Sequence, residues 1–487
     1  MTAATREASG GGTTRLSRRP ELALVALFLT SRCLLHRSGV SMQSLHLEGS
    51  WQLIDPELLR QALLESLVYL HSQPPLYNLL IGSLLKLEPD PAAAAALLDG
   101  LYAALGLTLV LLLHHLMRRL GVGPKLSFTA AALFTLSPAA LLYENYAFYT
   151  LPCAVVLCLT VVLFERTVSA FTPWRAFSFF GAMTLLIYLR SLFQIEWFLV
   201  LALLCIWLLP GHRTAAVAAA ALPLVLVVGL YAKNAAITGQ FATSSWLGMS
   251  VAKLTTMQLP PAERVALVEA GKLSPVALRP PFSPPSDYPA LLAATPVTGI
   301  PVLDRVTEST GGVNFNHASY ASISRQYLED ALAVVREQPR VYLASMGRSY
   351  LMYFRPSADY PFLEPNRTRI APLVRVYNFA IAGQPRYTRA PQFELRGHGE
   401  IGYLIIAGLA LCVVSGGAAA ARCIRGRRKP ADAAIVFIWL NVLYVTLLGN
   451  ALEIDENQRF RFLINPLLVV VLAVIAARWI RTREGRR

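Results

Sequence analysis

Hydrophobic residues in this chain gather into long runs that are separated by shorter polar segments. A transmembrane helix needs about 20 predominantly apolar residues, with some tolerance in either direction. Runs of suitable length occur at 21–38, 97–117, 126–142, 150–165, 175–190, 195–210, 214–232, 401–421, 433–449 and 462–479. The pattern therefore predicts an all-α polytopic membrane protein with a bundle of about ten transmembrane helices.

One further apolar stretch, 76–87, does not fit an alternating series of spans. It follows the polar segment HSQPP at 71–75, and proline favours the first turn of a helix because its φ angle is already fixed near the helical value. If this stretch crossed the membrane, every basic segment after it would change sides. We therefore expect an amphipathic or re-entrant helix at the outer surface.

Basic segments gather on one side of the predicted spans. RLSRRP precedes the first span, and RWIRTREGRR closes the chain. Between successive pairs of spans lie MRRLGVGPK, ERTVSAFTPWR, GHR and RCIRGRRK. Ten alternating spans put all of these segments on the same side, which the positive-inside rule makes cytoplasmic. We expect a multi-pass protein of the plasma (inner) membrane with both termini in the cytoplasm.

Composition supports a membrane protein and argues against a nucleic-acid partner. The 487 residues are 55% hydrophobic and 15% charged, whereas soluble domains carry about 25% charged residues. The net charge of +15 could suggest nucleic acid, but the arginines flank apolar runs, so membrane topology and anionic lipid explain them. The six cysteines have no metal-binding spacing.

The order of apolar and polar segments divides the chain into five parts. These are a disordered cytoplasmic tail at 1–20, an N-terminal transmembrane core at 21–232 with a large first outer loop at 39–96, an extracytoplasmic cap at 233–400, C-terminal transmembrane helices at 401–479, and a basic cytoplasmic tail at 480–487.

The predicted topology brings acids and arginines from four loops to the outer face. Ionisable residues this close to membrane depth are costly and are usually functional. The candidates are Glu48, Asp55 and Glu57 in the first outer loop, Glu144 in the second, Arg190 and Gln194 in the third, and Glu453, Asp455, Glu456, Asn457, Arg459 and Arg461 in the last. His71 and Gln73 precede the outer-surface helix.

Several of these residues also have a purely structural explanation. Asp55 precedes Pro56 and Glu57, which is typical of a helix N-cap. His71 could cap the surface helix or bond lipid headgroups, and Arg190 could extend to the headgroups. The segment EIDENQRFR could be a solvated loop with internal ion pairs. The functional interpretation rests on the number of such residues that point to one side.

The combination of motifs resembles the GT-C membrane glycosyltransferases, in particular glycosyltransferase family 39. The resemblance lies in a His-x-x-Pro-Pro-Leu-like helix start, a lone acid after Ser-Pro in the second outer loop, and a closing ENQRFRF before the last span. It covers residues 21 to about 200 and 401–479. The family usually has Asp-Glu at the start of the first outer loop, where this chain has Glu48-Gly49 and Asp55-Pro56-Glu57.

The resemblance implies a sugar donor linked to polyprenyl phosphate and an acceptor hydroxyl on a protein, lipid or polysaccharide. It implies Asp55, or else Glu48, as the base, with Glu144 as a further catalytic acid. The residues implied to hold the donor phosphate are His71, Gln73, Arg190, Arg459 and Arg461. Those implied to support the acceptor are Glu57, Gln194, Glu456 and Asn457. Direct displacement with one carboxylate would invert the anomeric centre.

Alternatives to this enzyme remain open at the level of sequence. A transporter or flippase of lipid-linked sugars is the main one, although transporters place their polar groups near the bilayer midplane. An enzyme of another GT-C branch and a non-catalytic scaffold are the others. No cofactor is certain, and Glu453, Asp455 and Glu456 could bind a divalent cation. No phosphate-binding glycine loop is present, which argues against a nucleotide-sugar donor.

Overall fold

The computed structural model describes residues 19–44, 51–88, 90–384 and 401–484, and the regular elements in these ranges are helices. Outside the helices it has two isolated β-bridges. Six helices in these ranges are long and apolar enough to cross a membrane. They are α5 (Pro91–Arg119), α8 (Thr150–Ser169), α11 (Arg213–Thr238), α20 (Tyr403–Ile424), α21 (Pro430–Leu452) and α23 (Asn465–Glu484).

The other predicted spans are also helical but are shorter, bent or less apolar. Helices α6 (Pro124–Thr135) and α7 (Pro138–Glu144) meet at an angle of 58° and count as a seventh span if taken together. Helices α9 (Pro173–Leu189) and α10 (Ile195–Leu208) have 17 and 14 residues, and α1 (Arg19–Arg37) has 19. The all-α multi-pass class agrees with the sequence, and the count of ten spans stays a prediction.

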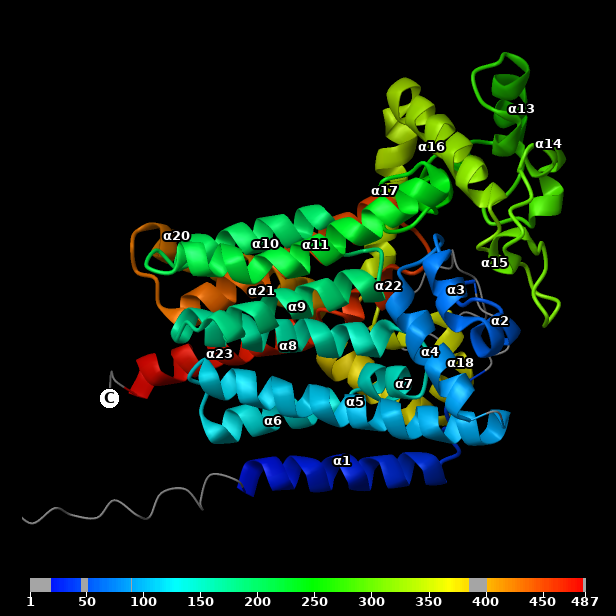
Figure 1. Cartoon of the computed structure of the whole chain (residues 1–487). Helices are drawn as coiled ribbons and strands as arrows, with labels where there is room; N and C mark the ends of the chain where they lie inside the picture. Colours follow the sequence, from blue (N-terminus) through cyan, green and yellow to red (C-terminus); the bar gives the residue numbers. More distant parts are fainter. Residues whose placement is uncertain (1–18, 45–50, 89, 385–400, 485–487) are drawn as a thin grey trace, which may run out of the picture.

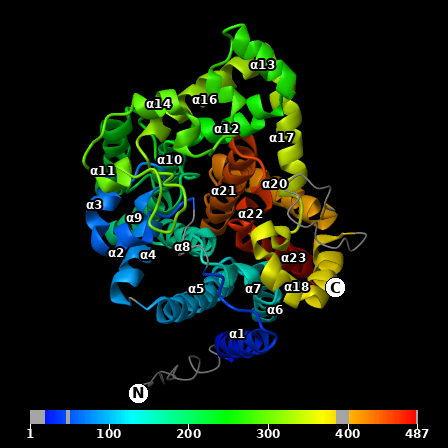
Figure 2. The ribbon, with the colours of Figure 1, turned by 90° about the vertical axis from the view of Figure 1, so that its right-hand side faces the viewer.

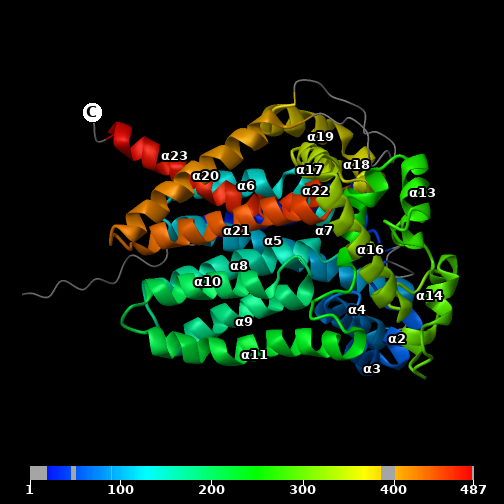
Figure 3. The ribbon, with the colours of Figure 1, turned by 90° about the horizontal axis from the view of Figure 1, so that it is seen from above.

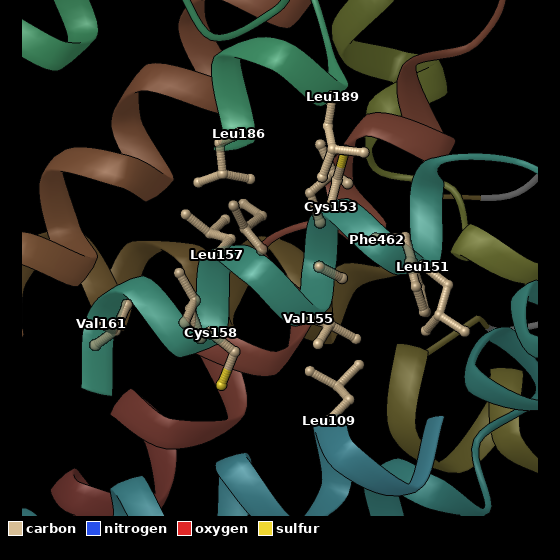
Figure 4. Close-up of a cluster of buried hydrophobic side chains, with 14 of the residues drawn as sticks. Leu109, Leu151, Cys153, Val155, Leu157, Cys158, Val161, Leu186, Leu189 and Phe462 are labelled. Carbon is tan, nitrogen blue, oxygen red and sulfur yellow. The ribbon is translucent and has the colours of Figure 1, made fainter. Parts of the chain in front are cut away.

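Helix α8 forms the centre of the bundle. It packs against α5, α9 and α21, and 72% of its apolar window is buried inside the protein. Figure 4 shows its side chains between Leu109 of α5, Leu186 and Leu189 of α9, and Phe462. Seen from above, α9, α10 and α11 form one flank of the bundle, while α20 and α23 lie on the other (Figure 3). Because α8 is surrounded on all sides, both of its ends are fixed.

The non-spanning helices gather at one end of the bundle, on the right in Figure 1. They include α2 (Pro56–Gln61), α3 (Leu63–Val68), α4 (Pro75–Leu87), α12 (Leu247–Leu254), α16 (Ser319–Glu337), α17 (Pro339–Tyr353) and α18 (Glu364–Arg369). The helix expected after Asp55 is interrupted at Ala62, where φ is −130°. The helix expected at 76–87 is α4. We call this side the outer end.

The beginning of α1, the end of α23 and the turns α5–α6, α8–α9, α10–α11 and α20–α21 lie at the opposite end (Figure 1). These are the segments that carry the basic clusters. The structure therefore places the described parts of those clusters on one side of the bundle, as the charge pattern requires. The assignment of that side to the cytoplasm stays a prediction.

Candidate functional site

The short helix α22 (Asn457–Phe462) carries the arginines of the closing motif. It lies near the middle of the outer end, with α2–α4 to one side and α17 and α18 to the other (Figure 2). It packs against α8, α17 and α21, and all six of its residues are buried. The motif is thus part of the protein interior and is not a solvated loop.

Two buried arginines share a group of aromatic rings, which we call the arginine–aromatic cluster: Arg190, Arg459, Phe148, Tyr149, Tyr360 and Phe460. The Arg459 guanidinium lies 4.6 Å from the Phe148 ring centre and 5.4 Å from those of Tyr149 and Phe460. The Arg190 guanidinium lies 4.3 Å from the Phe460 ring centre and 5.2 Å from that of Tyr149. Aromatic faces attract cations, so the rings hold both guanidinium groups close together.

The two arginines retain unused hydrogen-bond donors. Arg459 Nη2 donates to Glu456, whereas Arg459 Nε and Nη1 and Arg190 Nη1 are buried without a hydrogen-bond partner among the described residues. A buried donor left without a partner is costly, and a buried charge more so. Two guanidinium groups face one carboxylate here, so the cluster has spare positive charge and spare N–H groups. A phosphate, which offers several oxygens for bidentate contact, satisfies both.

Glu456 is the carboxylate of the cluster, and the chain itself supplies its cations. Its Oε1 accepts a hydrogen bond of 2.9 Å from the Tyr360 hydroxyl. Burial opposes ionisation, but the charges of Arg459 and Lys253 outweigh it and lower the pKa of Glu456. Glu456 is therefore a poor general base, since a carboxylate held ionised by two cations has little affinity for a proton.

Lys253 of α12 fills the space between the acids that precede α22. Its ammonium bonds Glu453 and lies 3.4 Å from Asp455 Oδ2. Asp455 has a φ of 94°, which is unusual for a residue with a side chain. Among the described residues no three His, Cys, Asp or Glu side chains are grouped so that they could hold a metal ion. The position considered for a divalent cation is thus taken by the lysine.

Asn457 follows Glu456 in the chain and supports the loop before it. Its Nδ2 donates to Glu453 O at 2.9 Å and to Asn450 Oδ1 at 3.0 Å. Its Oδ1, like Oε1 of Gln458, is buried without a partner among the described residues. These two oxygens are acceptors available to a hydroxyl-bearing ligand.

Arg461 faces away from the cluster. Its Nη1 donates to Tyr353 O and its Nη2 to Ser357 Oγ at 3.0 Å, and burial lowers the pKa of Arg461 to about 10. It lines a mostly apolar cavity of about 160 Å³ between α6, α7, α20 and α23, together with Asn465. The two arginines of the motif therefore belong to different sites.

The segment predicted to form the first outer loop meets the segment predicted to form the cap along a seam in which the hydrogen bonds of Asp55 are complete. The Asp55 carboxylate caps α2 by accepting from Glu57 N at 3.0 Å. It also accepts from Ser309 N at 2.9 Å, from Ser309 Oγ, and from Arg305 Nη1 at 3.3 Å. Arg305 bonds Glu57 as well, at 2.8 Å. The nearby Glu308 is buried, and burial together with the charge of Asp55 raises the pKa of Glu308 to about 8.

His71 belongs to the same seam. Its Nε2 lies 3.0 Å from Asn316 O, and a carbonyl can only accept, so Nε2 carries the proton. Its Nδ1 then accepts from Ser245 Oγ at 2.8 Å. Burial, with the charge of Lys233, lowers the pKa of His71 to about 3. His71 is thus a neutral, fully bonded link to the cap, and Gln73 is buried close by at the start of α4.

Glu144 and Gln194 lie apart from both groups. Arg32 of α1 holds Glu144 through two hydrogen bonds of 2.8 and 2.6 Å. Gly106 of α5 leaves room for this pair, since a Cβ there would lie 2.2 Å from Glu144 Oε2. Gln194 accepts from the Tyr231 hydroxyl at 2.6 Å. Glu48 lies outside the described residues.

Of the predicted site residues, the structure brings Arg190, Arg459, Glu456 and Asn457 together. The sequence analysis did not identify Lys253, nor did it identify the aromatic rings that surround the two arginines. A signal for Lys253 was present, because it is the only charged residue between Lys233 and Glu263. The segment YENYAFY at 143–149 gave a signal for the rings, as aromatic residues crowd around the lone acid.

The chain matches no protein-family model, and no curated protein or solved structure is significantly similar to it. The function proposed below therefore depends on the residues of this chain and on the resemblance of its motifs.

Proposed function

We propose that this protein is an integral membrane glycosyltransferase that moves a sugar from a polyprenyl-phosphate-linked donor to an acceptor hydroxyl on the extracytoplasmic face. The observation that carries the proposal is the pair of buried arginines with three guanidinium nitrogens that have no hydrogen-bond partner in the described part of the chain. A lipid phosphate supplies the negative charge and the acceptor oxygens that this pair lacks.

The same arrangement suits the phosphate as a leaving group. When the bond between sugar and phosphate breaks, negative charge grows on the phosphate oxygen. Donors that are already aimed at that oxygen stabilise the charge without reorganisation, and they do so more strongly where water is excluded. In the arginine–aromatic cluster the rings of Tyr149 and Phe460 cover Arg190. This assigns transition-state stabilisation to Arg190 and Arg459.

The acceptor hydroxyl needs a base to take its proton. Asp55 was the first choice among the acids of the first outer loop, but four hydrogen bonds already hold its carboxylate. Glu144 is paired with Arg32. The proposal therefore gives the role of base to Glu48, the alternative acid of the same loop. Attack by the hydroxyl opposite the phosphate inverts the anomeric centre.

The main alternative is a transporter or flippase of lipid-linked sugars. One observation favours it: α6 and α7 form a broken helix with a 58° bend, and broken helices are common in transporters. Against it, α22, which carries Arg459, lies at the outer end of the bundle (Figure 1) and not midway along it.

The test uses the purified full chain in liposomes with a panel of polyprenyl-phosphate sugars and a mixture of envelope acceptors. We expect release of polyprenyl phosphate with transfer of one sugar. Glu48→Gln should abolish transfer, while Asp55→Asn should keep most of it. Flux of a fluorescent lipid-linked sugar across the bilayer without any bond cleavage would support the transporter instead. Equal loss of transfer in both variants would contradict the assignment of the base to Glu48 rather than Asp55.

A further inference from the structure

A basic cavity lies at the opposite end of the molecule from the arginine–aromatic cluster. It has a volume of about 530 Å³ and lies where α5 and α8 end and α9 begins. Three of its lining residues are the arginines Arg119, Arg166 and Arg175, and Trp174 lines it as well. In the sequence these arginines belong to the basic segments MRRLGVGPK and ERTVSAFTPWR, which membrane topology and anionic lipid explain in general terms without predicting a site.

Each arginine of this cavity has a hydrogen-bond partner, but only Arg119 is paired with a carboxylate. Glu165 bonds Arg119 through both of its carboxylate oxygens. Arg166 lies 3.3 Å from His115 Nε2, and Arg175 donates to Ala170 O at 2.6 Å. Among the described residues neither of these two arginines forms an ion pair. Three guanidinium groups thus face one carboxylate around a single hollow.

A contrast at the same end of the bundle shows that topology alone does not produce this arrangement. On the flank formed by α20, α21 and α23, Arg422 and Arg478 lie 2.7 and 3.2 Å from Asp432. There the positive-inside rule is met by arginines that share a buried acid. Around Trp174 the same kind of residue surrounds an open space.

The basic cavity continues into an apolar one. A second hollow of about 630 Å³ shares Trp174 with the first and is lined by Pro173, Phe177 and three alanines of α11. Trp174 is 72% exposed, and its ring stacks on that of Phe177 with the ring centroids 5.5 Å apart. Tryptophan favours the boundary between lipid headgroups and acyl chains, so the residue stands where a charged pocket meets a hydrocarbon surface.

We propose that Arg119, Arg166 and Arg175 bind the headgroup of one anionic phospholipid of the inner leaflet. One acyl chain of this lipid lies along the apolar hollow between α9 and α11, which we call the trough. The charge fits a phosphodiester, and basic pockets at the cytoplasmic ends of membrane helices are suited to anionic headgroups. The trough accounts for the chain, which a free phosphate does not have. The site is independent of the proposed transfer reaction.

The test compares lipids with identical chains on the purified, delipidated full-length protein. Native mass spectrometry measures retention of phosphatidylglycerol against phosphatidylcholine, and glycerol 3-phosphate serves as the headgroup without chains. We expect one phosphatidylglycerol to be retained in preference to phosphatidylcholine. Arg166→Gln with Arg175→Gln should weaken it about 30-fold, since each arginine near an anionic lipid contributes about fivefold.

Two matched controls separate this site from general charge and general hydrophobicity. Arg425→Gln with Arg427→Gln removes the same charge from exposed positions at the same end of the bundle and should leave retention unchanged. Ala218→Trp, which fills the trough, should weaken phosphatidylglycerol but not glycerol 3-phosphate, whereas Val225→Trp on the same helix should affect neither. Equal losses in both arginine pairs, or equal retention of the two lipids, would overturn the proposal.

Discussion

The arginine–aromatic cluster and the seam between the first outer loop and the cap contain the same kinds of residue but differ in how their hydrogen bonds are satisfied. In the seam, Asp55 accepts four bonds and both nitrogens of His71 have partners. In the cluster, Arg459 and Arg190 keep three buried nitrogens without partners among the described residues. The seam's bonds hold the structure together, whereas in the cluster two neighbouring cations share the unpartnered donors, and this concentration is what we assign to a ligand.

The largest expected effect comes from removing the central cation of the cluster. Arg459→Gln alone would leave the half-buried Glu456 without its ion-pair partner, so we combine it with Glu456→Gln. Loss of one prearranged donor to a developing charge costs about 10²–10³-fold in turnover. Transfer by the double variant should fall by at least that factor while the protein stays folded in thermal unfolding. Full activity would remove Arg459 from the mechanism.

Arg190→Met should separate stability from activity. No described carboxylate pairs with Arg190, so its burial is a cost that a methionine does not bear, and apolar replacement of buried charge stabilises by about 1–4 kcal/mol in other proteins. We expect a higher melting temperature without substrate and a loss of transfer. A lower melting temperature with normal transfer would assign Arg190 to the fold.

Asp55→Asn should show the opposite behaviour. Asparagine also caps helices well, but it has one acceptor oxygen where Asp55 has two, and it loses the ion pair with Arg305. We expect a destabilisation of about 1–3 kcal/mol in chemical unfolding, because a donor such as Ser309 N loses its acceptor, and nearly normal transfer. Arg305→Gln, which removes the ion pair from the other side, should cost about 1 kcal/mol or less, because the Arg305 side chain is 39% exposed. A large loss of transfer in Asp55→Asn alone would restore Asp55 as the base.

Two further effects concern pH and report on the seam. The pKa of His71 is about 3 in the folded protein against 6.5 ordinarily. The unfolded chain therefore binds more protons between these values, and stability falls as pH falls through that window, by up to about 1.4 kcal/mol per pH unit. Hydrogen exchange at Ser72 should follow this fall, and His71→Gln should abolish it. An unchanged profile in the variant would contradict the buried neutral histidine.

The contribution of Glu308 to stability changes with pH in the direction opposite to that of His71. Its pKa is about 8 against 4.5 ordinarily, so the folded state holds a proton that the unfolded chain has lost, and stability falls as pH rises from 4.5 to 8. Glu308→Gln should flatten this limb in thermal unfolding. A slope that persists in the variant would place the titrating group elsewhere.

Much of the fold was readable from the sequence because it depends on local patterns. Apolar runs gave the positions of the long helices, and Asp55-Pro56-Glu57 gave the N-cap of α2 that the structure contains. The break between α2 and α3 at Ala62 could not be predicted, because nothing in the sequence interrupts the apolar stripe there. The partner of Glu144 was also hidden, because Arg32 lies within the first apolar run.

The candidate site was predicted only in part because it depends on packing between distant segments. Arg190 follows α9, Tyr149 precedes α8, and Arg459 lies on α22, so only the folded bundle brings them together. Sequence also grouped Arg459 with Arg461. Two residues apart on a helix, they point about 200° apart and reach different surroundings.

The most direct test of the central claim is equilibrium binding of polyprenyl phosphate to the purified protein, with polyprenol of the same length as the ligand without phosphate. If the unpartnered guanidinium groups are a phosphate site, the protein should prefer polyprenyl phosphate by about 100-fold or more, at about 1.5–3 kcal/mol for each charged hydrogen bond. That preference should fall about tenfold or more in Arg190→Met, which removes one of the three donors, and should persist in Arg305→Gln. Equal binding of the two ligands to the unaltered protein would contradict the account.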